Sequence, residues 1–254
     1  MYKIPANTLF IGKNLVFMPE CHSTNTFALD LCQQPSAPAD GTLIITSNQT
    51  AGRGQRGKEW LAESGKNLTF SIVLKPRFLS IRDQYYLNIF SSLAIRDYLV
   101  LHHCDKVRIK WPNDVYIRDK KVCGMLIENQ LSGNQFNATI LGIGLNINQM
   151  SFALPTAISL AIEKQQLFDL PSELEILLPL IESRYLQLRQ GSLSALMDEY
   201  LASLYWIHEE HTFRNVSLGE FKGTITGIDG IGHLKVSAQG KELLFDVKEL
   251  EYVN

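Results

Sequence analysis

The sequence lacks the features that would assign it at once to a secreted, membrane or metal-binding class. Its four cysteines form no Cys-x-x-Cys pair and lie far apart, at Cys21, Cys32, Cys104 and Cys123. That spacing suits neither a disulfide framework nor a zinc site. No uncharged apolar run approaches the ~18 residues of a membrane span, and the N-terminus lacks the basic and then apolar pattern of a secretion signal. Together these absences favour a cytoplasmic protein with reduced thiols.

Neither sign of charge dominates the chain. It has 24 Lys and Arg against 26 Asp and Glu, a net charge of −2, so the sequence indicates no broad electrostatic attraction to nucleic acid. It also contains no internal repeat, no G-x-S-x-G elbow of serine hydrolases and no P-loop motif. With 254 residues, 45% of them hydrophobic, the chain can form one large domain and a small appendage.

What the sequence does contain is a glycine- and arginine-rich segment at 52–57 with the spacing G-x-G-x-x-G. A dinucleotide-binding loop of that spacing opens directly into a helix. Here a strand-like run at 42–46 precedes the segment and a β-rich run at 67–74 follows it. We therefore interpret it as a loop between strands, in which Arg53 and Arg56 offer planar donors to a phosphate or a carboxylate.

Hydrophobic periodicity predicts an α+β fold on a mixed β-sheet flanked by helices. The predicted strands are 15–20, 42–46, 67–74, 106–111, 114–118, 122–129 and 139–147, with Asp119-Lys120-Lys121 as the turn of a hairpin. The predicted helices run from about Ser23 to Gln33, from 83 to 102, from 173 to 190 and from 192 to 204. From Thr212 onward, short strands predict a small β-barrel. We place the boundary near His208, which gives a main domain over 1–207 and a β domain over 208–254.

Two polar clusters near the N-terminus are candidates for ligand binding. Ser23-Thr24-Asn25 is, taken alone, a helix cap, and the functional alternative is that its hydroxyls bind a neutral polar ligand. The glycine-arginine loop is flanked by Gln49 and Trp60. A solvated hairpin loop is the plain alternative, but three glycines in six residues carry a cost in unfolded-state entropy, so we favour a function.

Two further clusters follow in the second half of the predicted sheet. Lys110-Trp111-Pro112-Asn113-Asp114 is followed by Lys121 and Gly124, and either forms an ordinary charged hairpin or places a long cation over the sheet near a phosphate. Gly142-Ile143-Gly144-Leu145-Asn146 is either a strand against which another backbone packs or the close approach to a flat ligand.

Taken together, and in this order, these motifs resemble those of the biotin–protein ligases. The resemblance spans about residues 16–150, and the terminal β-module fits that family's small SH3-like domain. It implies a class II synthetase-like catalytic domain that carries out a two-step, adenylate-forming C–N ligation. Biotin and ATP, with Mg²⁺, form biotinyl-AMP, and the lysine amine of a biotin carboxyl carrier domain then displaces AMP. The resemblance also implies a form without a DNA-binding helix-turn-helix, with no nucleic-acid or membrane partner, and leaves a homodimer open.

The resemblance assigns roles residue by residue. The catalytic assignments are Arg53, Arg56, Lys121 and Asp114, where the cations offset the repulsion between carboxylate and α-phosphate. Asp114 is a candidate for positioning Lys121 or for assisting deprotonation of the amine. The assignments for biotin are Ser23, Thr24, Asn25, Gln49, Gly52, Arg53, Trp60, Lys121 and Gly124. Those for ATP and the adenylate are Arg53, Gln55, Arg56, Lys110, Trp111, Asn113, Lys121 and Asn146. No residue is assigned as a metal ligand.

Three positions depart from the family pattern. Gln55 stands where arginine is frequent, so either the adenylate is retained more weakly or another basic residue takes the place of that arginine. Cys123 replaces a common alanine, and the segment 151–162 offers Phe152 but no tryptophan to stack on adenine. Two alternatives stay open: a lipoate–protein ligase of the same fold, and a non-catalytic sensor of biotin or adenylate. Ser23, Thr24 and Gln49 favour biotin over lipoate because lipoate has no ureido group.

Overall fold

Seven strands from the first 145 residues form one mixed sheet in the order β1-β2-β3-β7-β6-β5-β4. The structure is a computed structural model and describes residues 2–247 and 249–253, with the side chain of Arg56 outside the described part. The strands are β1 (Leu15–Cys21), β2 (Thr42–Gln49), β3 (Leu68–Leu74), β4 (Val107–Lys110), β5 (Asp114–Ile117), β6 (Lys120–Ser132) and β7 (Gln135–Leu145). Only the β1–β2 pair of this sheet is parallel, and the other neighbours run antiparallel.

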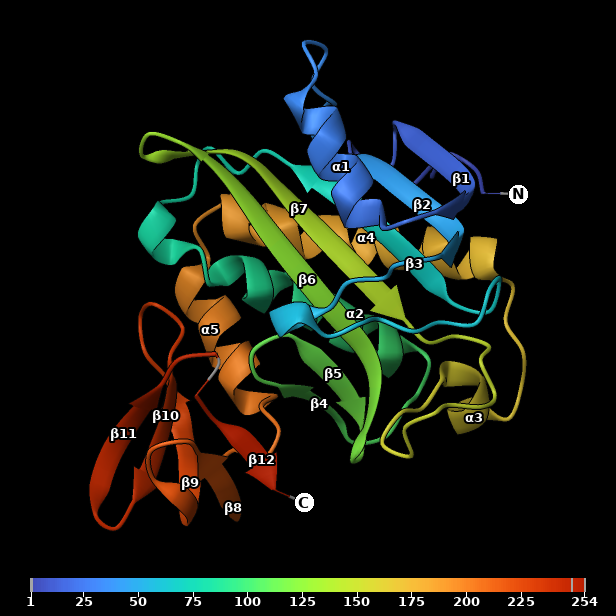
Figure 1. Cartoon of the computed structure of the whole chain (residues 1–254). Coiled ribbons are helices and arrows are strands. Elements are labelled where there is room, and N and C mark those ends of the chain that lie inside the picture. Colours follow the sequence, from blue (N-terminus) through green and yellow to red (C-terminus); the bar gives the residue numbers. More distant parts are fainter. Residues whose placement is uncertain (1, 248, 254) are drawn as a thin grey trace.

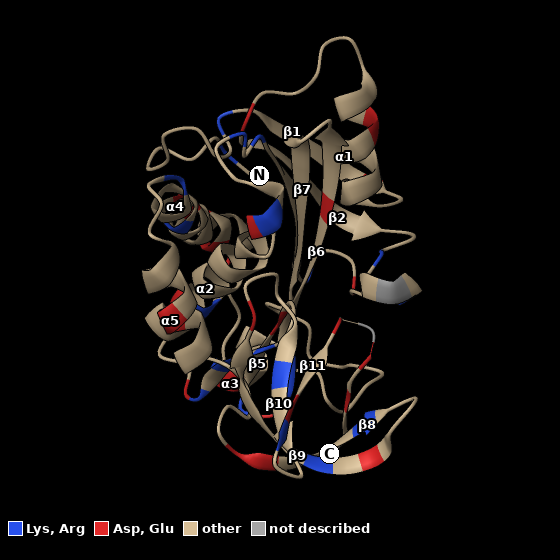
Figure 2. Cartoon of the chain, turned by 90° about the vertical axis from the view of Figure 1, so that its left-hand side faces the viewer, with Lys and Arg blue, Asp and Glu red and all other residues tan. Residues whose placement is uncertain are grey.

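The sheet is covered on both faces, which explains why its central strands are apolar throughout. Side chains of a strand alternate between faces, and in β2 Leu43 and Ile45 join one buried cluster whereas Ile44 joins the other. The larger cluster lies under α2 (Tyr86–Leu101), α4 (Leu170–Arg189) and α5 (Leu193–Ala202), and α1 (Thr24–Gln33) covers the opposite face. Figure 2 shows these two helical layers on either side of the sheet.

The C-terminal part of the chain forms a second, fully antiparallel sheet in the order β11-β10-β9-β8-β12. Its strands are β8 (Glu210–Asn215), β9 (Gly219–Ile228), β10 (Leu234–Ala238), β11 (Lys241–Phe245) and β12 (Glu251–Val253). This sheet lies below β4, β5 and α5 in the view of Figure 1. Its buried residues, among them Phe213 and Val236, continue the core of the first sheet without a break. The division at 207/208 stays a prediction.

A buried carboxylate fixes the N-terminal segment to the helical layer. Glu182 of α4 is only 4% exposed and accepts hydrogen bonds from the backbone N–H groups of Leu9, Phe10 and Ile11, at 2.5, 2.8 and 2.8 Å. Buried backbone donors need partners, and here one side chain accepts from three consecutive residues, of which Ile11 is fully buried.

The predicted α+β class and the small C-terminal β unit are confirmed, with differences at the ends of elements. The hairpin turn was placed wrongly at Asp119-Lys120-Lys121, because β6 already begins at Lys120 and the turn is formed by Arg118 and Asp119. Arg118 has a φ of 53°, a conformation that sequence patterning does not reveal for arginine. Sequence patterning also missed the short helix α3 (Leu160–Lys164) and the 3₁₀ turn η1 (Gln55–Gly57). Among the described helices, none has both the length and the apolar character to cross a membrane.

Candidate active site

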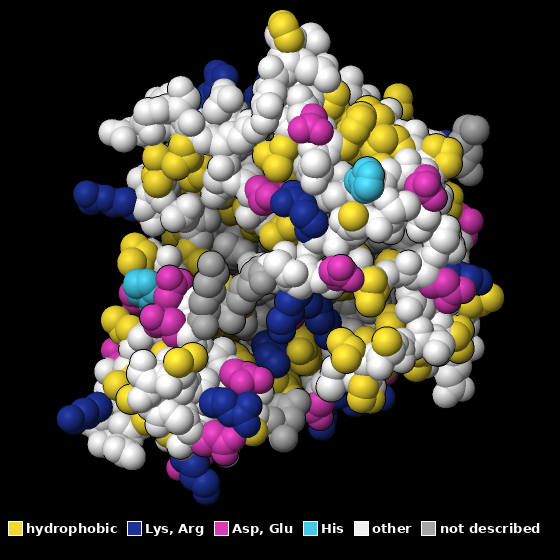
Figure 3. All heavy atoms as spheres, in the orientation of Figure 1, with side chains coloured by type: hydrophobic (Ala, Val, Ile, Leu, Met, Phe, Trp, Pro, Cys, Tyr) yellow, Lys and Arg dark blue, Asp and Glu magenta, His cyan; other side chains and the backbone are white. Residues whose placement is uncertain are grey.

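A cleft of about 1540 Å³ runs across the sheet from the N-terminus of α1 to the edge of the second sheet. The loop between β2 and β3, the strand ends around β4–β6 and the segment 149–157 line it. Figure 3 shows the hollow near the middle of this face, with Lys and Arg side chains gathered in it. The cleft therefore contains the four clusters that the sequence singled out.

One end of the cleft has a floor of neutral polar groups at the start of α1. Ser23 caps this helix through its hydroxyl, which accepts from the Thr26 N–H at 3.5 Å. The carbonyl oxygen of the Gln49 side chain accepts from the backbone N–H and the hydroxyl of Thr24, at 2.8 and 3.2 Å. The Ser71 hydroxyl lies 2.7 Å from that of Thr24. These contacts fix the orientation of Thr24 and Gln49 at the cleft surface.

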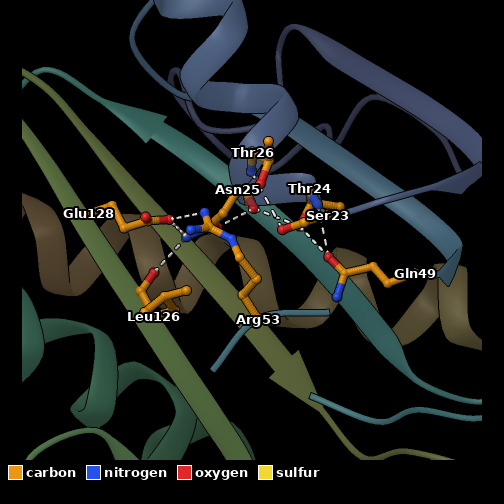
Figure 4. A network of polar contacts seen from close by, with 9 residues as sticks. Ser23, Thr24, Asn25, Thr26, Gln49, Arg53, Leu126 and Glu128 are labelled. Carbon is orange, nitrogen blue, oxygen red and sulfur yellow. Dashed lines mark hydrogen bonds and ion pairs between the residues drawn. The ribbon is translucent and has the colours of Figure 1, made fainter. Parts of the chain in front are cut away.

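Asn25 connects this floor to the arginine loop, as Figure 4 shows. Its amide nitrogen donates to the Leu126 carbonyl oxygen at 3.1 Å and to Glu128 at 2.8 Å, and its carbonyl oxygen lies 2.6 Å from the Ser71 hydroxyl. The same Glu128 oxygen accepts from the Arg53 guanidinium at 2.7 Å. Both the amide nitrogen and the amide oxygen of Asn25 thus form hydrogen bonds to protein atoms. Asn25 therefore supports the pocket from behind and presents no free group to a ligand.

Trp60 lines the cleft and packs against two glycines that are paired with each other in the sheet. Gly124 of β6 is paired with Gly144 of β7. A Cβ atom at 144 would lie 2.6 Å from the indole nitrogen of Trp60 and closer to two ring carbons, and one at 124 would lie 3.1 Å from its Cζ3. A Cβ at Gly142 would meet Asn25, at 3.0 Å from its amide nitrogen and closer to two other side-chain atoms. The glycines of this cluster therefore make room for protein side chains, where the sequence had left open a packed backbone or a flat ligand.

Arg53, Lys110 and Lys121 are among the cations that line the cleft, and they lie in different electrostatic settings. Arg53 is paired with Glu128, and the ammonium of Lys121 lies 2.7 Å from Asp114 and 5.6 Å from the centre of the Trp60 ring. Lys110 forms no ion pair within the described residues. Its ammonium lies over the rings of Tyr116 and Tyr252, 5.1 and 4.5 Å from their centres. Burial lowers the pKa of Lys110, and the positive charge of Lys121 acts in the same direction while Asp114 opposes it.

Two buried amides flank the cations. The amide nitrogen of Asn113 donates to the Met125 carbonyl oxygen, and the Met125 N–H donates back to the Asn113 carbonyl oxygen at 3.1 Å, which fixes this turn to β6. Asn146 is 3% exposed and donates from its amide nitrogen to the Ile158 carbonyl oxygen at 3.1 Å. The residue lines the cleft, and its buried amide oxygen has no partner among the described residues. Buried polar atoms are nearly always satisfied, so this oxygen is a candidate acceptor for a ligand.

The remaining candidates lie around the same cleft. Gly52 lines it and packs against Gln49 and Trp60, and Gln55 and Phe152 also line it. The indole N–H of Trp111 points to the second sheet and donates to the Gly232 carbonyl oxygen at 2.9 Å. The side chain of Arg56 lies outside the described residues. Cys123 is buried, which raises the pKa of its thiol, and it packs as a small apolar residue.

Comparison with known proteins assigns this cleft to a family. The model of the biotin/lipoate A/B protein ligase family matches residues 18–146, about half of the chain and all four clusters. The chain belongs to that family. It is 28% identical to the bifunctional ligase/repressor BirA of Bacillus spizizenii over 91% of this chain and 72% of the relative. It is 37% identical to the biotin–[acetyl-CoA-carboxylase] ligase of Paracoccus denitrificans over 49% of this chain, and it spans only 51% of that relative.

A solved structure supports the same assignment for nearly the whole chain. The biotin protein ligase from Aquifex aeolicus, solved in complex with biotin and ATP, superposes with a TM-score of 0.77. The sequences are 25% identical, and the match covers 94% of this chain and 98% of the other. Both sheets of this chain therefore have counterparts in a ligase of known structure.

Sequence reasoning missed two side chains that line this ligase cleft, Tyr116 and Tyr252, and two that hold its lining residues in place, Ser71 and Glu128. Ser71 stands between Phe70 and Ile72 in a buried strand. A small polar residue between buried apolar residues was the signal that could have identified it. Glu128 likewise interrupts the apolar pattern of β6. Tyr116 and Tyr252 gave no signal, because two rings so far apart in sequence come together only when the second sheet packs against β4 and β5.

Proposed function

We propose that this protein is an ATP-dependent biotin–protein ligase that attaches biotin to a lysine of a carboxyl carrier domain through biotinyl-AMP. The observation that carries the proposal is the juxtaposition of two different binding environments within one cleft. A neutral polar floor at Thr24 and Gln49 lies beside a group of cations that includes Arg53 and Lys121, and Trp60 covers the junction between them. A molecule with a polar uncharged head and a carboxylate tail fits this arrangement.

The polar floor suits the ureido ring of biotin. The amide nitrogen of Gln49 has no hydrogen bond to the described residues, while its carbonyl oxygen is held by Thr24. That nitrogen can therefore donate to the ureido oxygen, and the hydroxyls of Ser23 and Thr24 offer further polar contacts at the same end. The Trp60 ring supplies the apolar wall that the rest of biotin needs.

The cations suit the adenylation step. The carboxylate oxygen of biotin attacks the α-phosphorus of ATP, a P–O bond forms, and the P–O bond to pyrophosphate breaks. Two anions must approach each other in this step, and Arg53, Lys110 and Lys121 would offset their repulsion. Mg²⁺ would arrive with ATP, because it is commonly held by substrate phosphates and one or two carboxylates. The pairing of Asp114 with Lys121 supports a role for Asp114 in positioning that cation.

The nucleotide would lie at the other end of the cleft. The unsatisfied amide oxygen of Asn146 can accept from the exocyclic amine of adenine. Phe152 lines the cleft and offers an aromatic face near that end. In the second step the acceptor amine attacks the acyl carbon and AMP leaves. The loop at 52–57 would protect the mixed anhydride from water until the amine arrives. A cytoplasmic location, as the four free thiols suggest, is part of the same proposal.

Exchange of labelled pyrophosphate into ATP tests the first step and separates biotin from lipoate. The protein is incubated with MgATP, labelled pyrophosphate and either acid, and we expect exchange with biotin and little with lipoate. Exchange with lipoate alone would assign the protein to the other branch of the family. No exchange with either acid, together with tight biotin binding, would support the sensor alternative.

A further inference from the structure

The C-terminal part of the chain holds the strand that carries Lys110 into the cleft. β4 is the edge strand of the seven-stranded sheet, and its free edge is covered by the segment that leads into β8. The Ile109 N–H donates to the Ser203 carbonyl oxygen at 2.8 Å, and the Tyr205 N–H donates to the Ile109 carbonyl oxygen at 2.9 Å. The indole N–H of Trp111 then donates to the carbonyl oxygen of Gly232, in the turn between β9 and β10 of the second sheet. The residues on both sides of Lys110 are thus fixed by the C-terminal part of the chain.

Lys110 itself is held by aromatic rings. Its ammonium lies 4.5 Å from the centre of the Tyr252 ring in β12 and 5.1 Å from that of Tyr116 in β5, and 3.4 Å from the Tyr116 hydroxyl. An ammonium within ~6 Å of a ring centre is attracted to the ring face. Figure 1 shows β12 as the strand of the second sheet that reaches below β4. Tyr252 is therefore the point at which the second sheet contacts a cation of the cleft.

The charges around Lys110 leave its positive charge available to an anion. Asp114 and Glu251 favour the charged amine, and Lys121 and Lys58 oppose it. Asp114 is already paired with Lys121 at 2.7 Å, and no carboxylate among the described residues lies within ion-pair distance of Lys110. Rings hold a cation without neutralising it, whereas a carboxylate partner would have to be displaced by an incoming phosphate.

We propose that Tyr252 is a positioning residue for nucleotide binding, which holds the ammonium of Lys110 in place for the phosphates of ATP and so makes the second sheet part of the ATP half of the site. The inference rests on the proposed function, because it takes ATP to be the ligand of this end of the cleft. It assigns a selective effect to Tyr252: loss of the ring weakens ATP binding and leaves the biotin end unchanged.

The Tyr252 ring also packs within the second sheet, with ring centres 5.3 Å from those of Trp206 and Phe213, so a purely structural role is the competing explanation. Its hydroxyl is buried without a partner among the described residues. Tyr252→Phe therefore keeps both the packing and the ring face, while Tyr252→Leu removes the face. Phe221→Leu is a matched control, because Phe221 packs on Phe213 and Phe245 in the same sheet but does not line the cleft.

Steady-state pyrophosphate exchange with the full chain tests the proposal. We expect Tyr252→Leu to raise the KM for ATP about fivefold, in line with the loss of one cation–π contact, with a change of less than twofold in the KM for biotin. Tyr252→Phe should restore the wild-type value, and Phe221→Leu should leave it unchanged. Equal changes in both KM values, no change for Tyr252→Leu, or the same increase for Phe221→Leu would overturn the proposal.

Two further measurements keep the outcome decisive. If Tyr252→Leu does not fold, fluorinated phenylalanines at position 252 weaken the ring face while keeping its shape, and the KM for ATP should rise with the degree of fluorination; a constant KM would overturn the proposal. If the wild type catalyses no exchange, calorimetric binding of a non-hydrolysable ATP analogue replaces it. A fivefold weaker binding by the Leu variant would then support the role of Tyr252 even though the proposed function had failed, and unchanged binding would reject it.

Discussion

Substitution of Gly144 by alanine tests whether Trp60 must lie flat on the glycine pair of β6 and β7. The added methyl group would lie 2.6 Å from the Trp60 indole nitrogen, whereas non-bonded carbon contacts are most favourable at ~3.5–4.0 Å. Two ring carbons would lie closer still, so the ring must move by more than ~1 Å, because the strand beneath it is paired on both sides and cannot yield. Overpacking of this kind costs about 1–3 kcal/mol, which corresponds to a factor of about 5 to 150 in an equilibrium constant.

Because Trp60 lies in a loop, we expect this cost to affect ligand binding more than folding. The KM for biotin in pyrophosphate exchange should rise at least about fivefold, while thermal unfolding changes little. In a Trp60→Ala background the methyl group meets no ring, so Gly144→Ala should then add less than about twofold. Gly230→Ala is the control, since a Cβ there meets no atom within 4 Å. A wild-type KM for Gly144→Ala, or the same increase in both backgrounds, would refute the reasoning.

Four further predictions concern single residues. Lys121→Ala should reduce adenylate formation to near the limit of detection in single-turnover assays, and activity within a few-fold of wild type would show that another cation faces the α-phosphate. Glu182→Ala should lower the free energy of unfolding by about 2–4 kcal/mol in urea titrations, because three backbone N–H groups, the buried one of Ile11 among them, lose their acceptor, whereas the exposed Glu175→Ala on the same helix should change it by less than about 0.5 kcal/mol. Since burial lowers the pKa of Lys110, this amine loses its charge at a lower pH than an exposed lysine; the KM for ATP should rise on that alkaline limb, and Lys110→Arg, which stays charged, should move the limb to higher pH. Gln55→Arg should slow the release of biotinyl-AMP in a filter-binding assay, and an unchanged release rate would show that this loop position does not contact the adenylate.

Sequence patterning predicted the main elements well because their burial is regular. In β3 the alternate side chains that face the larger buried cluster are apolar, as at Phe70 and Ile72. The apolar residues of α2 show helical spacing along its whole length. The turn at Arg118 was misplaced because a positive φ at arginine leaves no trace in composition. α3 was missed because five residues give too little periodicity to detect.

The candidate site was predicted as a set of residues but not as a set of contacts. The residues named from the motifs line one cleft, among them Thr24, Gln49, Trp60 and Lys121. What each group does there depends on neighbours from distant segments. For example, the amide of Asn25 is used by Leu126 and Glu128, more than one hundred residues away, which the motif alone could not reveal.

The glycine motif shows the same limit. A pattern of glycines indicates a close approach but does not say what approaches. In this fold the neighbour of Gly144 is Trp60, and the neighbour of Gly142 is Asn25. The glycines therefore make room for two side chains with different places in the site: Trp60, which lines the cleft, and Asn25, which supports it from behind.

Mass spectrometry of a carrier domain tests the central claim most directly. The protein is incubated with biotin, MgATP and a biotin carboxyl carrier domain, and the carrier is digested and sequenced. We predict the addition of one biotinyl group to one lysine of the carrier, dependent on ATP and abolished by Lys121→Ala. An unmodified carrier, or one that accepts only a lipoyl group under the same conditions, would contradict the account.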